Sequence, residues 1–184
     1  MARKTDQNTP EGAQIEPESG ASEGLSHVDA AGGAPRSKMV DITQKPTTER
    51  TALARVRMRY PAGVLAGVLR DGGPKGPIEE IARAAGFLGA KKTPELIPMC
   101  HPLLVDHLEM ELEEVEPDLL EIRFLARTKG GTGVEMEAMV GAALAALTVY
   151  DMTKALDKGI RIESLELLEK TGGKSGVWRR DETA

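Results

Sequence analysis

The sequence predicts an α+β fold in which helices pack on one face of an antiparallel sheet. Strands are expected at 52–60, 107–113, 119–128 and 160–168. Apolar and polar residues alternate along the first and the last, and a single break in the last indicates a bulge at Ser164. Pro117-Asp118 marks a hairpin turn between the second and third of these segments, and helical stretches separate the other neighbours. Since two β–α–β crossings flank one hairpin, a ferredoxin-like topology is the leading candidate.

Composition limits the classes of function. The chain has 184 residues, enough for one domain with a core, and a formal net charge of -5. No global positive field attracts nucleic acid or a membrane surface, so an anionic ligand needs a local cluster of Lys or Arg. The single cysteine, Cys100, excludes an intramolecular disulfide and a multi-cysteine metal site within one chain. Without a signal peptide or an apolar span, we expect a cytoplasmic protein.

The two ends of the chain are expected to lie outside the fold. Residues 1–38 are rich in Gly, Ser, Pro, Glu and Gln and contain almost no large apolar side chains. Such a segment cannot bury enough surface to offset its chain entropy, so we expect a disordered N-terminal tail. One ordered domain is expected over 39–176, with a short C-terminal tail at 177–184.

The longest expected helix runs from near Gly133 to near Leu156. Good helix formers fill it and no proline interrupts it. Its uncharged middle is rich in small residues, which is typical of a helix that neighbours approach closely, a second copy of the chain included. The sequence from Thr132 to Glu135 matches a capping box, which gives Glu135 a structural role.

The charges of this helix lie only near its ends. Glu137 and Asp151 fall on the same face, within roughly 40° of each other, but about 21 Å apart along the axis. One small substrate atom cannot contact both carboxylates. Either the ligand is long or a second subunit completes the site. The alternative for Asp151 and Lys154 is a surface ion pair of little energetic weight.

Lys75 stands just before a helix that Pro77 opens, at about 78–89. A cation at a helix N-terminus opposes the helix dipole, so an anion bound between Lys75 and this helix is a fair alternative to a structural role.

The segment Ile97–Leu103 is expected to form a stiff, extended loop because prolines occupy positions 98 and 102. Cys100 and His101 project to opposite sides of such a loop, so they do not form a natural dyad. Each is either a packed residue or a single substrate contact.

Cationic side chains gather in two further segments. Arginines 55, 57 and 59 share one face of the first strand, either as a solvated face or as the lining of an anionic site. After the last strand, Lys170 and Lys174 stand among glycines and hydroxyl groups in Lys170–Gly176. This is not a Walker A loop, because Leu168 stands where that motif needs glycine and no helix follows. It is either a flexible basic segment or a loop that holds phosphate.

Together these motifs resemble the cyclic pyranopterin monophosphate synthase (MoaC) family of molybdenum cofactor biosynthesis. The resemblance extends in order from 39 to 176 and rests on these segments: Met39–Ile42, Lys75–Gly76, Ala84–Gly86, Ala90–Thr93, Ile97–Leu103, Thr132–Ala138, Leu147–Met152 with Lys154, and Lys170–Gly176. It implies a homohexamer, a trimer of dimers, with active sites at a dimer interface. The implied reaction converts the GTP-derived 3′,8-cyclo-7,8-dihydro-GTP to cyclic pyranopterin monophosphate and releases diphosphate. It requires acids, bases and cations but no redox cofactor, and whether Mg²⁺ accompanies the triphosphate is left open.

The resemblance also implies residue roles. Asp151 looks like the catalytic aspartate, Lys154 its partner in proton transfer, and Lys75 a catalytic and phosphate-neutralising group. The expected substrate contacts are Lys170, Lys174, Met99, Cys100, His101, Met136 and Glu137, the last two binding the guanine-derived ring. No metal ligands are expected. Two departures are that Pro77 replaces a common aspartate and Gly131 replaces a lysine found in some relatives, which removes one expected acid and one expected phosphate contact.

Two competing functions stay open at this point. A non-enzymatic sensor on the same fold would bind a small molecule without chemistry, and it would not need lysines that converge on one triphosphate. A hydrolase would stop at diphosphate release, and mass spectrometry of the product would distinguish it.

Overall fold

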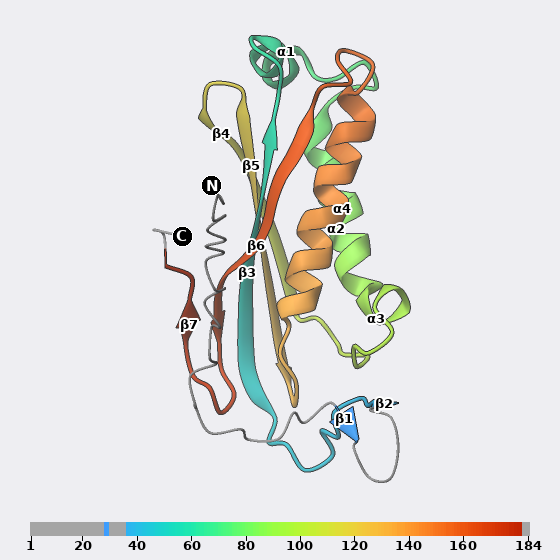
Figure 1. The fold of residues 1–184 in the computed structure, drawn as a ribbon, viewed down its shortest axis with the longest axis vertical. Helices are drawn as coiled ribbons and strands as arrows, with labels where there is room; N and C mark the ends of the chain where they lie inside the picture. Colours follow the sequence, from blue (N-terminus) through green and yellow to red (C-terminus); the bar gives the residue numbers. More distant parts are fainter. Residues whose placement is uncertain (1–27, 30–35, 182–184) are drawn as a thin grey trace, which may run out of the picture. The chain divides into compact units, whose positions relative to one another are not determined.

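The computed structural model describes residues 28–29 and 36–181 (Figure 1). The chain divides into two units, 1–38 and 39–184. In the first, the short strands β1 (Val28–Asp29) and β2 (Arg36–Ser37) pair antiparallel. The rest of the tail expected at 1–38 lies outside the described residues, so its disorder stays a prediction.

The second unit is built on an antiparallel sheet whose strand order is β4-β5-β3-β6-β7. Its strands are β3 (Thr48–Arg59), β4 (His107–Glu116), β5 (Leu119–Gly130), β6 (Arg161–Thr171) and β7 (Trp178–Arg179). The four expected strands are present, which confirms the α+β class, and the ferredoxin-like assignment stays a prediction. β7 lies within the range expected as a C-terminal tail and pairs with the end of β6.

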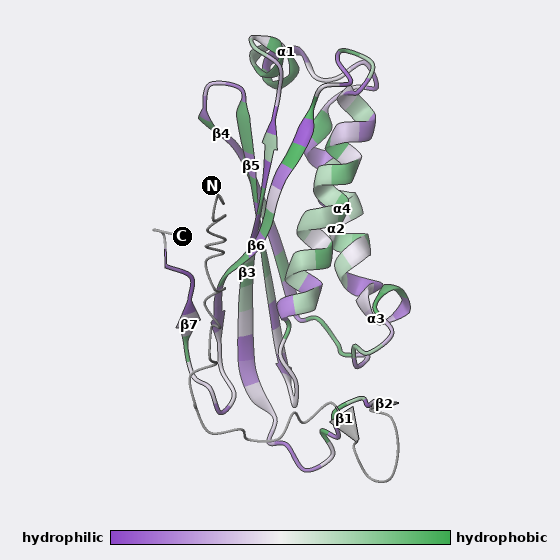
Figure 2. Cartoon of the chain, viewed as in Figure 1, coloured by the Kyte–Doolittle hydropathy of each residue, from purple (hydrophilic) through white to green (hydrophobic). Residues whose placement is uncertain are grey.

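The helices are α1 (Val64–Asp71), α2 (Ile78–Lys91), α3 (Thr93–Leu96) and α4 (Glu135–Thr153). α2 and α4 cover one face of the sheet, as expected (Figure 1). Side chains point alternately to the two faces of the sheet along β3. Those of Ala52, Ala54, Val56 and Met58 are buried beneath the helices, and the residues between them face the other side. Figure 2 shows the same alternation as stripes of hydropathy along the strands.

Two glycines let α2 and α4 approach each other over the ring of Phe124, which is buried on β5. A Cβ on Gly86 would lie 2.7 Å from this ring and 2.9 Å from the backbone oxygen of Gly141. A Cβ on Gly141 would also collide with the ring. Phe87 meets it edge-on, with the ring centroids 5.9 Å apart. The small residues of α4 therefore serve close packing within the chain.

The register of β6 against β3 shifts twice. One shift separates the partners of Arg57 and Met58, which are Ser164 and Ile162, and it confirms the bulge expected near Ser164. The other lies between the partners of Leu53 and Ala54. Between these two shifts, Glu166 of β6 comes to stand opposite Arg55 of β3.

Candidate functional site

A first cluster of expected site residues lies at the C-terminal end of α4. Asp151 accepts hydrogen bonds from two lysines: Lys75 Nζ lies 2.6 Å from Oδ2, and Lys154 Nζ lies 2.7 Å from Oδ1. The hydrogen bonds from Lys154 and Lys75 hold the pKa of Asp151 at about 2, and Asp151 in turn raises the pKa of Lys154. All three side chains are half-exposed. The cluster is therefore an ionised carboxylate between two cations that face solvent.

A tight glycine loop brings Lys75 to this place. Gly73 and Gly76 exchange backbone hydrogen bonds of 2.9 and 2.8 Å, and Gly76 has a φ of 106°, a conformation that favours glycine. A Cβ on Gly73 would lie 2.7 Å from the backbone oxygen of Met152. The loop thus packs directly on the last turn of α4, which explains how Lys75 reaches an aspartate 76 positions away in sequence.

A second cluster lies at the N-terminal end of α4. Lys170, near the end of β6, donates to Ser175 Oγ at 2.7 Å, and its Nζ lies 3.6 Å from Glu135 Oε1. The intervening turn depends on Gly172 and Gly173, both with positive φ. Lys174 is exposed on the same turn and has no ion-pair partner within residues 36–181. Lys170 is thus held in place by a carboxylate and a hydroxyl group, whereas no ion pair among residues 36–181 holds the side chain of Lys174.

Glu137 is the most unusual ionisable group of this second cluster. Its side chain is only 3% exposed. Burial raises its pKa to about 7, and the charge of Glu135 adds to the rise. Burial raises the pKa of the Cys100 thiol, and the negative charge of Glu137 adds to that rise. The loop 97–103 therefore lies near the first turns of α4, with Cys100 and His101 half-buried and Met99 exposed. Met136, next to Glu137 on the helix, is exposed as well.

The predicted capping box is wrong. α4 begins at Glu135 with Val134 as its N-cap, and no side chain makes a capping hydrogen bond there. The Glu135 carboxylate instead folds over Gly133 and pairs with Lys170. The physical reason is that a cation delivered by β6 offers this carboxylate a stronger partner than a backbone N–H. Glu135 thus belongs to the site and not only to the helix end.

The expected site residues form two groups within one chain. Lys75, Asp151 and Lys154 meet at one end of α4, whereas Lys170 and the segments 97–103 and 135–137 gather at the other. From Glu137 to Asp151 the helix rises about 21 Å. These two carboxylates were expected on one face, but Glu137 is buried and Asp151 is half-exposed. The loop 97–103 lies beside the N-terminal group, and the glycine loop 73–76 packs on the last turn of α4 beside the C-terminal group.

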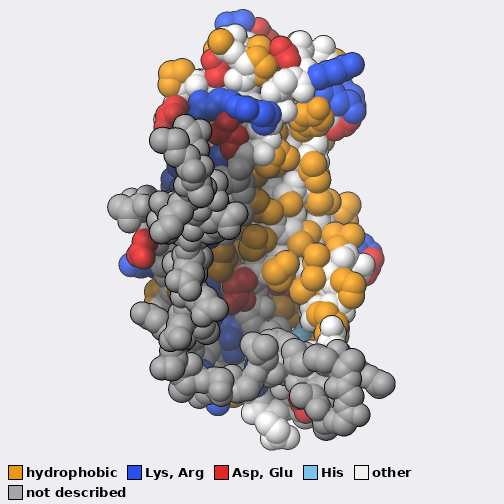
Figure 3. Space-filling view, viewed as in Figure 1, with side chains coloured by type: hydrophobic (Ala, Val, Ile, Leu, Met, Phe, Trp, Pro, Cys, Tyr) orange, Lys and Arg blue, Asp and Glu red, His pale blue; other side chains and the backbone are white. Residues whose placement is uncertain are grey.

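An apolar stripe on α4 joins the two groups. Met136, Ala143 and Leu147 follow one line along the helix, because successive steps of seven and four residues return to nearly the same angle. Leu147 is 53% exposed, and Ile162 and Leu165 of the neighbouring β6 are exposed beside the helix. Figure 3 shows hydrophobic side chains gathered over α4. Exposed apolar surfaces of this kind occur at protein–protein contacts, at membrane contacts and in ligand-binding grooves.

Arg50 is a contributor that sequence reasoning missed. Its Nε donates to the Gly130 backbone oxygen at 3.0 Å, and its Nη2 lies 3.4 Å from the Gly131 oxygen. The guanidinium also fills the space beside Gly173. Arg50 thus ties the Lys170–Gly176 turn to the segment before α4. No local pattern marks it, because its partners lie 80 or more positions away.

Two features are absent from the described parts of the chain. Residues 28–29 and 36–181 contain no group of three or more His, Cys, Asp or Glu side chains arranged to hold a metal ion. Within the same ranges, no helix is long and apolar enough to cross a membrane.

Comparison with known proteins identifies relatives across nearly the whole chain. The model of the MoaC family matches residues 39–173. The cyclic pyranopterin monophosphate synthase of Thermomicrobium roseum is 46% identical over 159 residues, which cover 86% of this chain and 94% of the relative. The protein of the same name from Chloroflexus aggregans is 44% identical over 167 residues, or 90% and 99% of the two chains. A solved structure, that of AtUAH in complex with glyoxylate, is 13% identical with a TM-score of 0.30, covering 74% of this chain and 30% of that one, and so weak a likeness carries no argument.

Proposed function

The chain belongs to the MoaC family, and from this premise we propose that it is a lyase of molybdenum cofactor biosynthesis, a cyclic pyranopterin monophosphate synthase. Its substrate is 3′,8-cyclo-7,8-dihydro-GTP. In the phosphorus chemistry, a sugar hydroxyl oxygen forms a bond to the α-phosphorus, the bond from that phosphorus to the bridging oxygen breaks, and diphosphate leaves. The observation that carries the residue assignment is the cluster of Lys75, Asp151 and Lys154.

Lys75 and Lys154 neutralise the triphosphate and the diphosphate leaving group. Both ammonium groups lie within 2.7 Å of the same carboxylate and face solvent, so a polyphosphate can engage them without rearrangement of the fold. Two cations on one polyanion also stabilise the charge that develops on the leaving group.

Asp151 takes up the proton of the attacking hydroxyl, with Lys154 as its partner in proton transfer. In the free protein the two lysines hold the pKa of Asp151 at about 2, too low for an efficient base near neutral pH. When the triphosphate engages the lysines, they share their charge with the phosphates, and Asp151 becomes more basic. Asp151 therefore becomes an effective base only when the phosphate site is occupied.

The other end of α4 binds the guanine-derived ring. The Glu137 carboxylate accepts hydrogen bonds from ring N–H groups, Met136 offers an exposed apolar contact, and the loop with Met99, Cys100 and His101 borders the ring. Lys170 and Lys174 provide further positive charge for phosphates.

We further propose that each site is shared between two copies of the chain. A two-fold axis across the apolar stripe near Ala143 would bring the Glu137 end of one α4 to the Asp151 end of the other. An isologous contact of this kind makes two identical sites per dimer. It also covers Leu147, which is otherwise exposed. Three such dimers form the homohexamer.

The proposed reaction needs no redox cofactor, because bonds to phosphorus and nitrogen are exchanged without net oxidation. Whether Mg²⁺ accompanies the triphosphate stays open. A cytoplasmic location accords with the use of a nucleotide-derived substrate.

Replacing Asp151 by Asn tests the assigned base. Turnover should fall at least about 100-fold, the scale of a lost general base, while calorimetry still detects nucleotide binding. Asp71→Asn is the matched control, since Asp71 is an exposed carboxylate on α1 that pairs with Arg70. Unchanged turnover in Asp151→Asn would disprove the role. Mass spectrometry of the product identifies a hydrolase if diphosphate appears without a cyclic phosphate.

Mixing two inactive variants tests the shared site. Asp151→Asn damages one half of each site and Lys170→Ala the other, so a mixed dimer carries one intact site and one doubly damaged site. Random exchange of equal amounts should restore about a quarter of wild-type turnover. If each chain formed a whole site by itself, the mixture would stay inactive.

A further inference from the structure

The four arginines of β3 differ in their partners. Three of them form ion pairs with carboxylates of other strands: Arg55 with Glu166, Arg57 with Glu121, and Arg59 with Glu116 and Glu163. Arg50 is the exception. Among residues 28–29 and 36–181 it pairs with no carboxylate, and its hydrogen-bond acceptors are the backbone oxygens of Gly130 and Gly131. Its positive charge is therefore not balanced by a direct partner.

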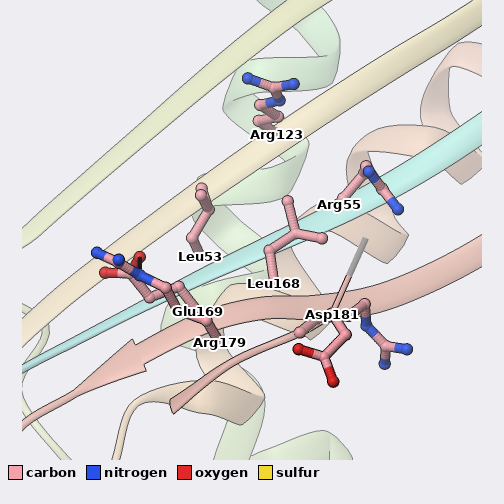
Figure 4. Close-up of a pocket in the computed structure, with 8 residues that line it drawn as sticks. Leu53, Arg55, Arg123, Leu168, Glu169, Arg179 and Asp181 are labelled. Atoms are coloured by element: carbon pink, nitrogen blue, oxygen red, sulfur yellow. Dashed lines mark hydrogen bonds and ion pairs between the residues drawn. The ribbon is translucent and has the colours of Figure 1, made fainter. Parts of the chain in front are cut away.

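The usual arrangement in this sheet is seen around a hollow of about 280 Å³ beside β6 and β7 (Figure 4). Three arginines that line it form ion pairs of 2.6 to 2.8 Å: Arg55 with Glu166, Arg123 with Glu121, and Arg179 with Glu169. Arg180 and Asp181 add one charge of each sign. The charges of this hollow thus balance within the chain, in contrast to that of Arg50.

Arg50 also lies on the other face of the sheet. Since side chains alternate along a strand, Arg50 shares its face with Ala52, beneath the helices, and not with Arg55. Its side chain is half-buried there. Ala52 is the register partner of Lys170 on β6, so Lys170 projects from the same face. Arg50 and Lys170 are therefore diagonal neighbours at the end of the sheet where α4 begins.

The Arg50 guanidinium joins two segments that are distant in sequence. On one side, its Nε and Nη2 lie 3.0 and 3.4 Å from the backbone oxygens of Gly130 and Gly131. On the other side, its Nη1 fills the space that a Cβ on Gly173 would need. A Cβ on Gly172 would lie 3.2 Å from the Arg50 Cα atom. Glycines at 172 and 173, both with positive φ, let the turn pack directly on Arg50.

The two joined segments are those that hold Lys170. The turn supplies Ser175, whose Oγ lies 2.7 Å from the Lys170 Nζ atom. The segment 130–131 leads into α4, whose first residue, Glu135, has its Oε1 3.6 Å from the same Nζ atom. Both partners of the Lys170 ammonium therefore belong to segments that Arg50 contacts, although Arg50 itself does not touch this group.

We propose that Arg50 is a positioning residue for phosphate binding, which holds the Lys170 ammonium in place by joining segment 130–131 to the turn 170–176. The inference rests on the proposed function, in which Lys170 provides positive charge for phosphates. Arginine suits the task because its planar fork can donate to two carbonyl oxygens while another nitrogen contacts the turn. Lysine carries the same charge but has one compact ammonium group.

A double-mutant cycle tests whether Arg50 acts through Lys170. Calorimetry with GTP, which contains a guanine and a triphosphate, compares wild type, Arg50→Ala, Lys170→Ala and the double variant at one salt concentration. Each single substitution should raise Kd by about 10-fold or more, the scale of a lost charge-assisted hydrogen bond. The double variant should bind like Lys170→Ala, since Arg50 then has no ammonium to position. If Arg50 touched the phosphates directly, the two losses would multiply, and the inference would be overturned.

Two measurements separate the geometry of Arg50 from its charge. Arg50→Lys keeps the charge but not the fork, so it should bind GTP about as weakly as Arg50→Ala. Guanidinium chloride at millimolar concentration should restore binding to Arg50→Ala, whereas sodium chloride at the same concentration should not. Arg83→Ala is the matched control, because Arg83 of α2 also donates to a backbone oxygen, that of Met110, at 2.7 Å. It should leave Kd unchanged. Wild-type affinity in Arg50→Lys would contradict the proposed role.

Trypsin cleavage after Lys174 reports on the turn without any ligand. Release of the turn should speed this cleavage in Arg50→Ala, relative to wild type and Arg83→Ala, as mass spectrometry of the fragments measures. An unchanged cleavage rate would overturn the inference. Circular dichroism of each variant shows whether the fold is retained. Coupled losses in GTP binding without formation of a cyclic phosphate would reject the proposed activity alone, whereas turnover with multiplying losses would reject the role of Arg50 alone.

Discussion

Replacing Glu137 by Gln should make the protein more stable at alkaline pH. The buried Glu137 carboxyl has a pKa of about 7 in the folded protein, against an ordinary value of 4.5. At pH values between 4.5 and about 7, Glu137 keeps its proton in the folded protein but has lost it in the unfolded chain. The free energy of unfolding therefore falls as pH rises through this window, and above pH 7 the full cost of a buried carboxylate is present.

The size of the effect follows from the shift in pKa. Each unit corresponds to 1.36 kcal/mol, so the shift amounts to roughly 3 kcal/mol. Gln has nearly the same shape and stays neutral at every pH. Glu137→Gln should therefore match wild type near pH 4.5 and exceed its free energy of unfolding by up to roughly 3 kcal/mol at pH 8.

Urea unfolding of both proteins at pH 5, 6, 7 and 8, at one protein concentration, measures the difference. Glu135→Gln is the matched control, because it removes an equal charge two residues away from a side chain that is 30% exposed. The free energy of unfolding of Glu135→Gln should still fall with rising pH by most of the amount seen in wild type. A stability difference between Glu137→Gln and wild type that is the same at pH 5 and pH 8 would refute the reasoning.

Two further predictions concern the other end of α4 and the core. Lys75→Ala removes one of the two cations on Asp151, so the Asp151 pKa should rise from about 2 toward its ordinary range, which carboxyl ¹³C NMR measures; an unchanged pKa would deny the contact. Gly86→Ala should destabilise by about 1–3 kcal/mol in thermal or urea unfolding through overpacking, whereas Gly67→Ala, with open space around it, should stabilise by about 0.5–1 kcal/mol. Equal effects of the two substitutions would contradict the packing of α2 on α4.

Local patterns predicted the elements because burial along a strand or helix repeats at the period of the backbone. The alternation in β3 identified its buried residues, and the broken period in β6 identified its bulge. α4 was expected at 133–156 and spans 135–153, a difference at the ends where fraying and capping compete.

The site was harder to predict because its contacts join distant segments. The sequence shows Glu135 near a helix start but not Lys170 beside it, so a capping role was the simpler prediction. The burial of Glu137 and its raised pKa depend on tertiary packing, and no window around Glu137 contains that information. Likewise, the pairing of Arg57 and Arg123 with Glu121 depends on the register of β3 against β5.

The position of both functional groups on one continuous α4 has a mechanical consequence. The helix acts as a rigid spacer, since its length fixes the spacing of the two groups in each chain and, in the proposed dimer, the distance between the two sites. One residue inserted between Gly141 and Leu147 would rotate one end against the other by about 100°. Both sites would then be lost together, although no side chain that touches the substrate had changed.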